Sequence, residues 1–305
     1  MSQLNWCRTN LGTSGKPLKV RLRPRMGMYA PDWVRLAAGN LKWYTDKGFD
    51  GVGDPAPSNS NWKEIPDGVP IWWNAKYLEA AADFNKLIAD HFGSHVSLCE
   101  VVMGWPSTQF AEPCLKQFGL QENLEAAVNA GWTEALDTAC FEAGWQSHKT
   151  VFSPLGISCY TAYNPIGTVT PGAIPSFAFG NATKTISLMN TQVSILGDKA
   201  VVGNNSLTAP FSVHNTHYQE MYNRMIELRN QGTNIAFQTE TLNRHISDYP
   251  TETVRGTIEL GEAWGATSIE IPIGCENLSV ALYDENYITP RYAKNINVQF
   301  ESNVV

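Results

Sequence analysis

The sequence predicts an α/β protein built as a (β/α)8 TIM-type barrel. From about residue 75 onward, β-rich runs alternate with amphipathic helical runs, which is typical of parallel strands joined by helical crossovers. Such alternation fits either a doubly wound sheet or a barrel. The expected strands end in polar residues that could converge on one site, and no glycine-rich phosphate loop follows any of them. These two observations favour the barrel.

The elements follow from local periodicity and from glycines placed where helices should end. Apolar spacing predicts helices over residues 77–92, 123–145, 179–196, 213–230 and 251–264. Runs rich in β-branched and apolar residues predict strands over residues 18–25, 96–105, 151–160, 199–205, 235–240 and 267–273. A complete barrel needs eight strands, and six are recognisable. The other two are either hidden in the opening residues and the following loop or absent from the chain.

Residues 26–74 interrupt this alternation. They are rich in Gly, Pro, Asn and Trp, and we interpret them as a long active-site loop with a hairpin. No repeat, low-complexity tract or linker divides the chain. We therefore expect residues 1–305 to form a single domain, incomplete at its N-terminus if two strands are absent.

Charge and hydropathy limit the classes of partner. The chain has 22 Lys plus Arg against 29 Asp plus Glu, a net charge of -7, which disfavours nucleic acid as a partner. No apolar run approaches the roughly 20 residues needed to cross a bilayer, so no membrane is expected. The start, MSQLNWCRTN, shows no export signal. If that start is truncated, we expect a secreted or virion-associated protein rather than a cytoplasmic one.

Neither a metal nor a cofactor is predicted. The six cysteines are far apart and lack the spacing of zinc ligands, so free thiols are expected unless the protein is exported. His214, His217 and Glu220 fall on one broad face of an expected helix. A helix between barrel strands faces away from the active site, which favours a surface face over a metal site.

The tryptophans suggest carbohydrate. Ten are present, several of them in loop-like stretches, and sugar rings stack their C–H faces on indoles. We predict a cleft lined by Trp33, Trp72, Trp73 and Trp105. Packing beneath long connections is the alternative for any one of them.

Several motifs together resemble a known group of enzymes. The runs KVRLRPRMGMYAPDWV, VPIWWNAKYLEAAADFNKLIADHFG, MGWPSTQFAEPC and NIAFQTETL are similar to barrel glycosidases related to glycoside hydrolase clan A. The resemblance covers most of residues 18–275. It implies a retaining glycosidase with an acid/base glutamate after the fourth strand and a nucleophilic glutamate ending the seventh. Residues 18–25 then match the third strand, so the first two βα units would lie upstream of Met1 or be shortened.

The resemblance implies that Glu112 is the acid/base and Glu240 the nucleophile. The clan commonly has Asn before its acid/base glutamate, whereas Ala111 precedes Glu112 here, and Glu100 is the reserve candidate. Retention needs a protonated acid and an ionised carboxylate about 5 to 5.5 Å apart. Apolar neighbours such as Phe110 and Pro113 suit an acid with a raised pKa. Arg23 and Arg25 are expected to hold carboxylates, with a solvated strand edge as the alternative. Glu270 is expected either to bind sugar or to pair with an inward arginine. Uncharged partners for sugar hydroxyls are expected from Tyr160, Asn204, Asn205 and Gln238.

Two other functions stay open. One is a carbohydrate-binding barrel without catalysis, for instance a phage tail or receptor-binding protein. The other is a lyase or aldolase, which is disfavoured because no expected strand ends in a Schiff-base lysine. The best-supported prediction is a glycoside hydrolase that acts on a polysaccharide or glycoconjugate without a cofactor.

Overall fold

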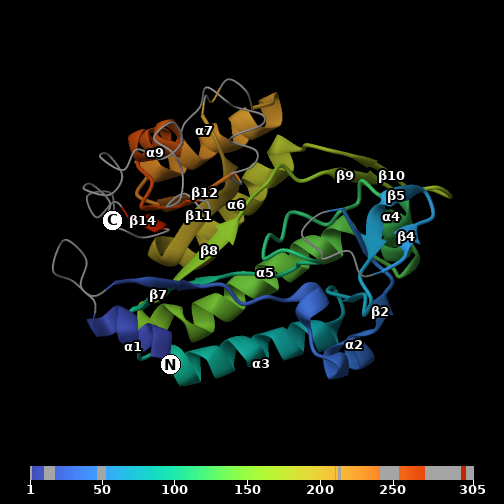
Figure 1. Cartoon of the computed structure of the whole chain (residues 1–305), viewed down its shortest axis with the longest axis horizontal. Coiled ribbons are helices and arrows are strands. Elements are labelled where there is room, and N and C mark those ends of the chain that lie inside the picture. Colours follow the sequence, from blue (N-terminus) through green and yellow to red (C-terminus); the bar gives the residue numbers. More distant parts are fainter. Residues whose placement is uncertain are drawn as a thin grey trace.

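A curled parallel sheet forms the centre of the protein (Figure 1). The computed structural model describes residues 2–9, 18–46, 53–209, 211, 214–240, 254–271 and 297–299. Six parallel strands make a half-barrel, and β14 (Asn297–Gln299) pairs with its last strand in the antiparallel sense. The parallel strands, in their order across the sheet, are β1 (Val20–Leu22), β7 (Leu98–Val102), β8 (Ser158–Ala162), β11 (Ala200–Leu207), β12 (Asn234–Thr239) and β13 (Ser268–Glu270).

The six strands expected from the sequence are confirmed, each shifted by a few residues at its ends. The closed eight-stranded barrel is not: in the described part of the chain the sheet runs from β1 to β13 without closing. The fold is therefore α/β with a half-barrel sheet.

Five longer helices cover the outside of this sheet: α3 (Ala75–Phe92), α5 (Glu134–Val151), α6 (Ala182–Leu196), α7 (Thr216–Asn230) and α9 (Val254–Ala263). Four of them begin with a side chain that accepts a hydrogen bond from a backbone N–H of the first turn, namely that of Asn74, Thr133, Asn181 or Asn215. Consecutive helices pack against each other from α3 to α7. Their inner faces and the sheet share one large apolar core.

The helix expected over residues 123–145 is two helices. α4 (Gln121–Asn129) ends just before Gly131, whose φ of 90° lies in the left-handed region, and α5 begins three residues later. The strand expected over residues 151–160 begins at Ser158, because α5 continues to Val151 and the 3-10 helix η2 (Ser153–Leu155) follows. Phe152 and Ile157 are buried, so their apolar character reflects packing rather than a strand.

The segment between β1 and α3 has more regular structure than the loop we expected. It holds the 3-10 helix η1 (Gly27–Tyr29), α2 (Asp32–Ala38) and two small antiparallel sheets. The expected hairpin is confirmed in β4–β5. The strands of these sheets are β2 (Asn40–Leu41) with β6 (Val69–Pro70), and β5 (Asn59–Glu64) between β3 (Tyr44–Thr45) and β4 (Pro55–Ala56).

Several elements outside this segment were not expected from the sequence, β14 among them. α1 (Ser2–Thr9) precedes the sheet, and the hairpin of β9 (Thr168–Thr170) and β10 (Ser176–Ala178) precedes α6. This hairpin lies close to α4, β4 and β5 at one end of the molecule (Figure 1). Among the described residues no helix is long and apolar enough to span a membrane. The five cysteines in the described ranges are free thiols, as expected; Cys275 lies outside them.

Candidate functional site

Polar side chains gather where the parallel strands end. Arg23 directly follows β1, Glu112 lies in the loop after β7, Asn164 follows β8, and Glu240 comes immediately after β12. The carboxyl ends of parallel strands meet at one edge of a sheet, so residues far apart in sequence converge there. The sequence therefore located this edge from strand ends alone.

Glu112 has neutral amides beside its carboxyl group. Its side chain is partly buried, and its Oε2 accepts a hydrogen bond of 2.9 Å from Nδ2 of Asn164, a residue that is itself 1% exposed. Burial raises the pKa of Glu112 above its ordinary value, while the amides of Asn205 and Asn164 and the charge of Arg23 act in the opposite direction. Desolvation outweighs these contacts. Glu112 thus holds a proton more readily than a glutamate in water does.

Glu240 lies in the same site as Glu112. Its backbone N–H donates to the carbonyl of Leu207 at 3.0 Å, which fixes the point where β12 ends beside β11. The charge of Glu240 contributes to the raised pKa of Glu112, after burial, and it also acts on the buried Tyr222. Because Coulomb interactions weaken with distance, this coupling places Glu240 within electrostatic reach of Glu112.

His214 was considered from the sequence only as a metal ligand, and the structure places it beside Glu240. Its Nε2 lies 3.1 Å from the carbonyl oxygen of Thr208, and its ring packs 5.1 Å from that of Tyr222. Burial lowers the pKa of His214, whereas the Thr208 carbonyl and the charge of Glu240 raise it. The half-buried imidazole is therefore part of the surroundings of the second carboxyl group.

A hydrogen-bonded cluster of amides and hydroxyls supports Asn164. Tyr218 Oη donates to Asn164 Oδ1 at 3.1 Å, and Asn204 Nδ2 donates to the carbonyl of Tyr163 at 2.7 Å. Tyr222 Oη donates to Asn204 Oδ1, also at 2.7 Å. The cluster fixes the orientation of the amide that contacts Glu112.

Tyr160 and Asn205 form a second support. Tyr160 Oη donates to Asn205 Oδ1 at 2.7 Å, and Asn205 Nδ2 is buried with no hydrogen-bond partner of normal geometry. The amide nevertheless lowers the pKa of Glu112, so it faces that carboxyl group. Gly203 makes room for this arrangement, since a Cβ there would stand 2.0 Å from the Tyr160 ring. Both predicted polar residues therefore lie at the site.

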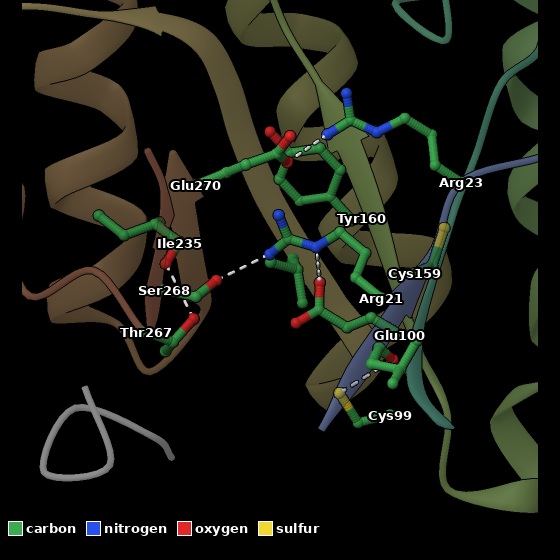
Figure 2. A network of polar contacts seen from close by, with 12 residues as sticks. Arg21, Arg23, Cys99, Glu100, Cys159, Tyr160, Ile235, Thr267, Ser268 and Glu270 are labelled. Atoms are coloured by element: carbon green, nitrogen blue, oxygen red, sulfur yellow. Dashed lines mark hydrogen bonds and ion pairs between the residues drawn. The ribbon is translucent and has the colours of Figure 1, made fainter. Parts of the chain in front are cut away.

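Two arginines connect the first and last parallel strands across the interior (Figure 2). Arg21 donates from Nε to Glu100 at 2.8 Å and from Nη2 to Ser268 at 2.8 Å, and its guanidinium lies 4.1 Å from the centre of the Tyr160 ring. Glu100, the reserve candidate for the acid, is thus paired with a permanent cation within β7, deeper than the strand ends.

Arg23 forms the second connection, nearer the strand ends. It donates to Gln238 Oε1 at 3.1 Å and to Glu270 Oε2 at 2.8 Å. The expectation that Arg23 holds a carboxylate is confirmed. The same expectation is wrong for Arg25, an exposed residue that donates to the hydroxyl of Tyr29 at 2.8 Å.

The four tryptophans expected along the cleft differ in exposure. Trp72 and Trp105 are 0% and 1% exposed, so neither presents an indole face to solvent, and Trp73 is partly buried against Trp72. Trp33 is 61% exposed and lines a mainly apolar groove of about 380 Å³ between α2 and α3. Loop composition suggested exposure for all four, but tertiary packing places two of them in the core.

No group of three or more metal-ligating side chains occurs among the residues that the structure describes. His217 and Glu220 lie on α7, whereas His214 precedes it. Comparison with protein-family models, with curated proteins and with solved structures gives no match to this chain. The site is therefore interpreted from its own geometry.

Three residues of the site escaped sequence reasoning: Asn164, Tyr218 and Tyr222. Asn164 lies two residues beyond the end of β8. The expected strand ended at Tyr160, so the strand-end residue considered from the sequence was Tyr160 rather than Asn164. An Asn-Pro pair after a strand is a recognisable loop signal. The two tyrosines lie on a helix, and no periodicity distinguishes a tyrosine that faces the site from one in the core.

Proposed function

We propose that the chain is a retaining glycoside hydrolase in which Glu112 is the general acid/base and Glu240 the nucleophile. The observation that carries the proposal is a carboxyl group beyond the end of a parallel strand, that of Glu112, which accepts from the buried Asn164 amide and lies within electrostatic reach of Glu240. Glu112 has a pKa raised by burial, and the charge of Glu240 adds to that shift. A pair of carboxyl groups in different protonation states is what a retaining mechanism requires.

In the first step the protonated Glu112 gives its proton to the leaving glycosidic oxygen. The ionised Glu240 attacks the anomeric carbon from the opposite face and forms a covalent glycosyl-enzyme. In the second step Glu112, now ionised, takes a proton from water, which displaces Glu240 with net retention. Asn164 would hold the acid in place throughout by its hydrogen bond to Oε2. The amides and hydroxyls around it offer partners for sugar hydroxyls.

The two roles can be separated with an external nucleophile. The chain is assayed on a panel of aryl glycosides and polysaccharides, with the first-formed anomer identified by NMR. Glu240→Gly is expected to lose turnover and to regain it with azide, giving a glycosyl azide of inverted configuration. Glu112→Ala is expected to give an azide product of retained configuration on activated substrates. Glu79→Gln, on the exposed face of α3, is the matched control.

A non-catalytic carbohydrate-binding protein is the second candidate, and the half-barrel sheet favours it, because the described residues supply six of the eight parallel strand ends that surround the site of a closed barrel. Sugar binding that is equal in the wild type and in Glu240→Gln, with turnover in neither, would support this candidate. Loss of turnover in Glu240→Gln with sugar binding retained would support the hydrolase.

A further inference from the structure

The loop that carries Glu112 is folded around a buried lysine. Lys116 is 6% exposed, and its Nζ donates to the backbone carbonyl of Pro106 at 3.0 Å and to that of Pro113. Pro106 lies near the start of the loop and Pro113 directly follows Glu112. One ammonium group therefore joins the two limbs of the turn that presents the carboxyl group.

The lysine is itself held from the opposite side. Asp137 on α5, 4% exposed, lies 3.7 Å from Lys116 Nζ and accepts from the indole N–H groups of Trp72 at 2.9 Å and Trp132 at 3.4 Å. Phe141 and Trp72 turn their rings toward the ammonium, 5.1 and 5.9 Å from it. Replacing a buried ion pair with apolar residues often costs no stability, so stability alone gives little reason for this one.

The rest of the turn is closed by its own backbone. Leu115 N–H donates to the carbonyl of Glu112 at 3.0 Å, and Thr108 Oγ1 donates to the carbonyl of Leu115 at 3.3 Å. With Lys116 in place, the side chain of Glu112 meets Asn164. Without the lysine, the carbonyls of Pro106 and Pro113 would lose their shared donor.

We propose that Lys116 is a positioning residue, which holds the Glu112 turn so that this carboxyl group stays partly buried against Asn164. The catalytic meaning of this inference rests on the proposed function, but the placement of Glu112 does not. Removing Lys116 would let the turn open and water reach Glu112.

The direction of the resulting pKa change separates placement from simple electrostatics. The charged groups acting on Glu112 are Arg23 and Glu240, and those acting on Lys116 are Asp137 and Lys184 together with the thiols of Cys114 and Cys140. Replacing Lys116 leaves all of them present. Loss of a positive charge by itself would raise the pKa of a carboxyl group, whereas hydration lowers a pKa that burial has raised. A fall in the pKa of Glu112 therefore reports movement.

The test is a carbon-13 NMR titration of the glutamate carboxyl groups in Lys116→Met, with the Glu112 signal assigned by Glu112→Gln. The matched control is Lys184→Met, a lysine that lines the same cavity but pairs with Glu134 at 3.4 Å. We expect the pKa of Glu112 to fall by about one unit in Lys116→Met and to stay unchanged in the control. An unchanged or raised pKa in Lys116→Met, or an equal fall in both variants, would overturn the proposal.

A second variant covers the case in which Lys116→Met does not fold. Lys116→Met/Asp137→Asn removes both charges and keeps an oxygen that can accept from the two indoles, so it avoids leaving a carboxylate unpaired. Where the wild type hydrolyses glycosides, kcat on substrates with poor leaving groups should fall on the order of tenfold, with KM little changed. If the wild type hydrolyses none, the proposed function fails, and the titration still decides the role of Lys116.

Discussion

The interior of the half-barrel and the edge where its strands end treat glutamate differently. In the interior, Glu100 and Glu270 each meet an arginine at 2.8 Å. At the edge, the hydrogen-bond donor on Glu112 is the neutral amide of Asn164, and burial raises the pKa of its carboxyl group. The same residue type is thus a structural anion in one region and a group able to carry a proton in the other.

The difference shows what each region contributes. Arg21 also bonds Ser268 and Arg23 bonds Glu270, both on β13, a strand that is not a hydrogen-bonded neighbour of β1, so the two arginines hold the curl of the sheet with side chains. At the edge, neutral partners leave the protonation state of Glu112 free to change, which acid/base chemistry needs. Charge compensation, rather than burial alone, distinguishes the two regions.

The largest expected effect comes from breaking the inner pair. Arg21→Met would leave Glu100 in the interior without its cation, and side chains that are 15% exposed keep little water to replace it. We expect the free energy of unfolding to fall by about 3 kcal/mol, measured by urea denaturation. Arg21→Met/Glu100→Met should recover most of that loss. A double variant as unstable as the single one would show that packing of the arginine stem, rather than charge pairing, stabilises the sheet.

His148 shows how burial affects the pKa of a side chain that has no hydrogen-bond partner among the described residues. It is 1% exposed, its two ring nitrogens make no hydrogen bond to any residue that the structure describes, and burial lowers its pKa to about 3. Because the unfolded chain takes up this proton first, the free energy of unfolding should fall as the pH drops from about 6.5 toward 3. The slope is about 1.4 kcal/mol per pH unit, or about 2 kcal/mol at pH 5. Thermal unfolding of His148→Phe should lack this slope, whereas His91→Phe, on an exposed residue, should keep it.

Glu112→Gln tests whether the buried carboxyl group of Glu112 destabilises the folded protein. A carboxyl group whose pKa is raised by folding stabilises the protein at low pH, and that contribution disappears as the pH rises through the folded pKa. At pH 7 we therefore expect Glu112→Gln to be more stable than the wild type by about 1 kcal/mol, while losing acid catalysis. Equal stability of the two proteins between pH 4 and 7 would contradict the raised pKa.

Local patterns were enough to predict the strands and the edge of the site. The alternation of strand and helix is a short-range signal, and parallel strands bring their ends together, whereas the pairing of Glu112 with Glu240 came from the resemblance to clan A glycosidases. Details that depend on residues distant in sequence were not predictable. Trp72 is buried because Asp137 accepts its indole N–H, and nothing in the stretch around Trp72 announces that partner.

The expectation that failed at Arg25 concerns which of two alternating arginines turns inward. Arg23 and Arg25 both follow β1, which ends at Leu22; Arg23 pairs with Glu270, whereas Arg25 is exposed and contacts Tyr29. Sequence alone indicated that arginines here pair with carboxylates, but the alternation gave both residues the same expected partner. The choice between them depends on contacts with residues distant in sequence, which periodicity does not reveal.

The smallest expected effect on stability is at Arg23, which contacts Glu270 and also acts on Glu112. Arg23 pairs with Glu270 at side-chain exposures of 28% and 30%, so water screens the pair and Arg23→Gln should cost only about 0.5 kcal/mol. Arg23 also lowers the pKa of Glu112, so its removal should raise that pKa, which a carboxyl titration can measure. Glu270→Gln, which leaves Arg23 charged, should not raise it. If Arg23→Gln destabilises the protein as much as Arg21→Met, the Arg23–Glu270 pair stabilises the fold as strongly as the Arg21–Glu100 pair. The contrast between interior and edge would then not hold for these two ion pairs.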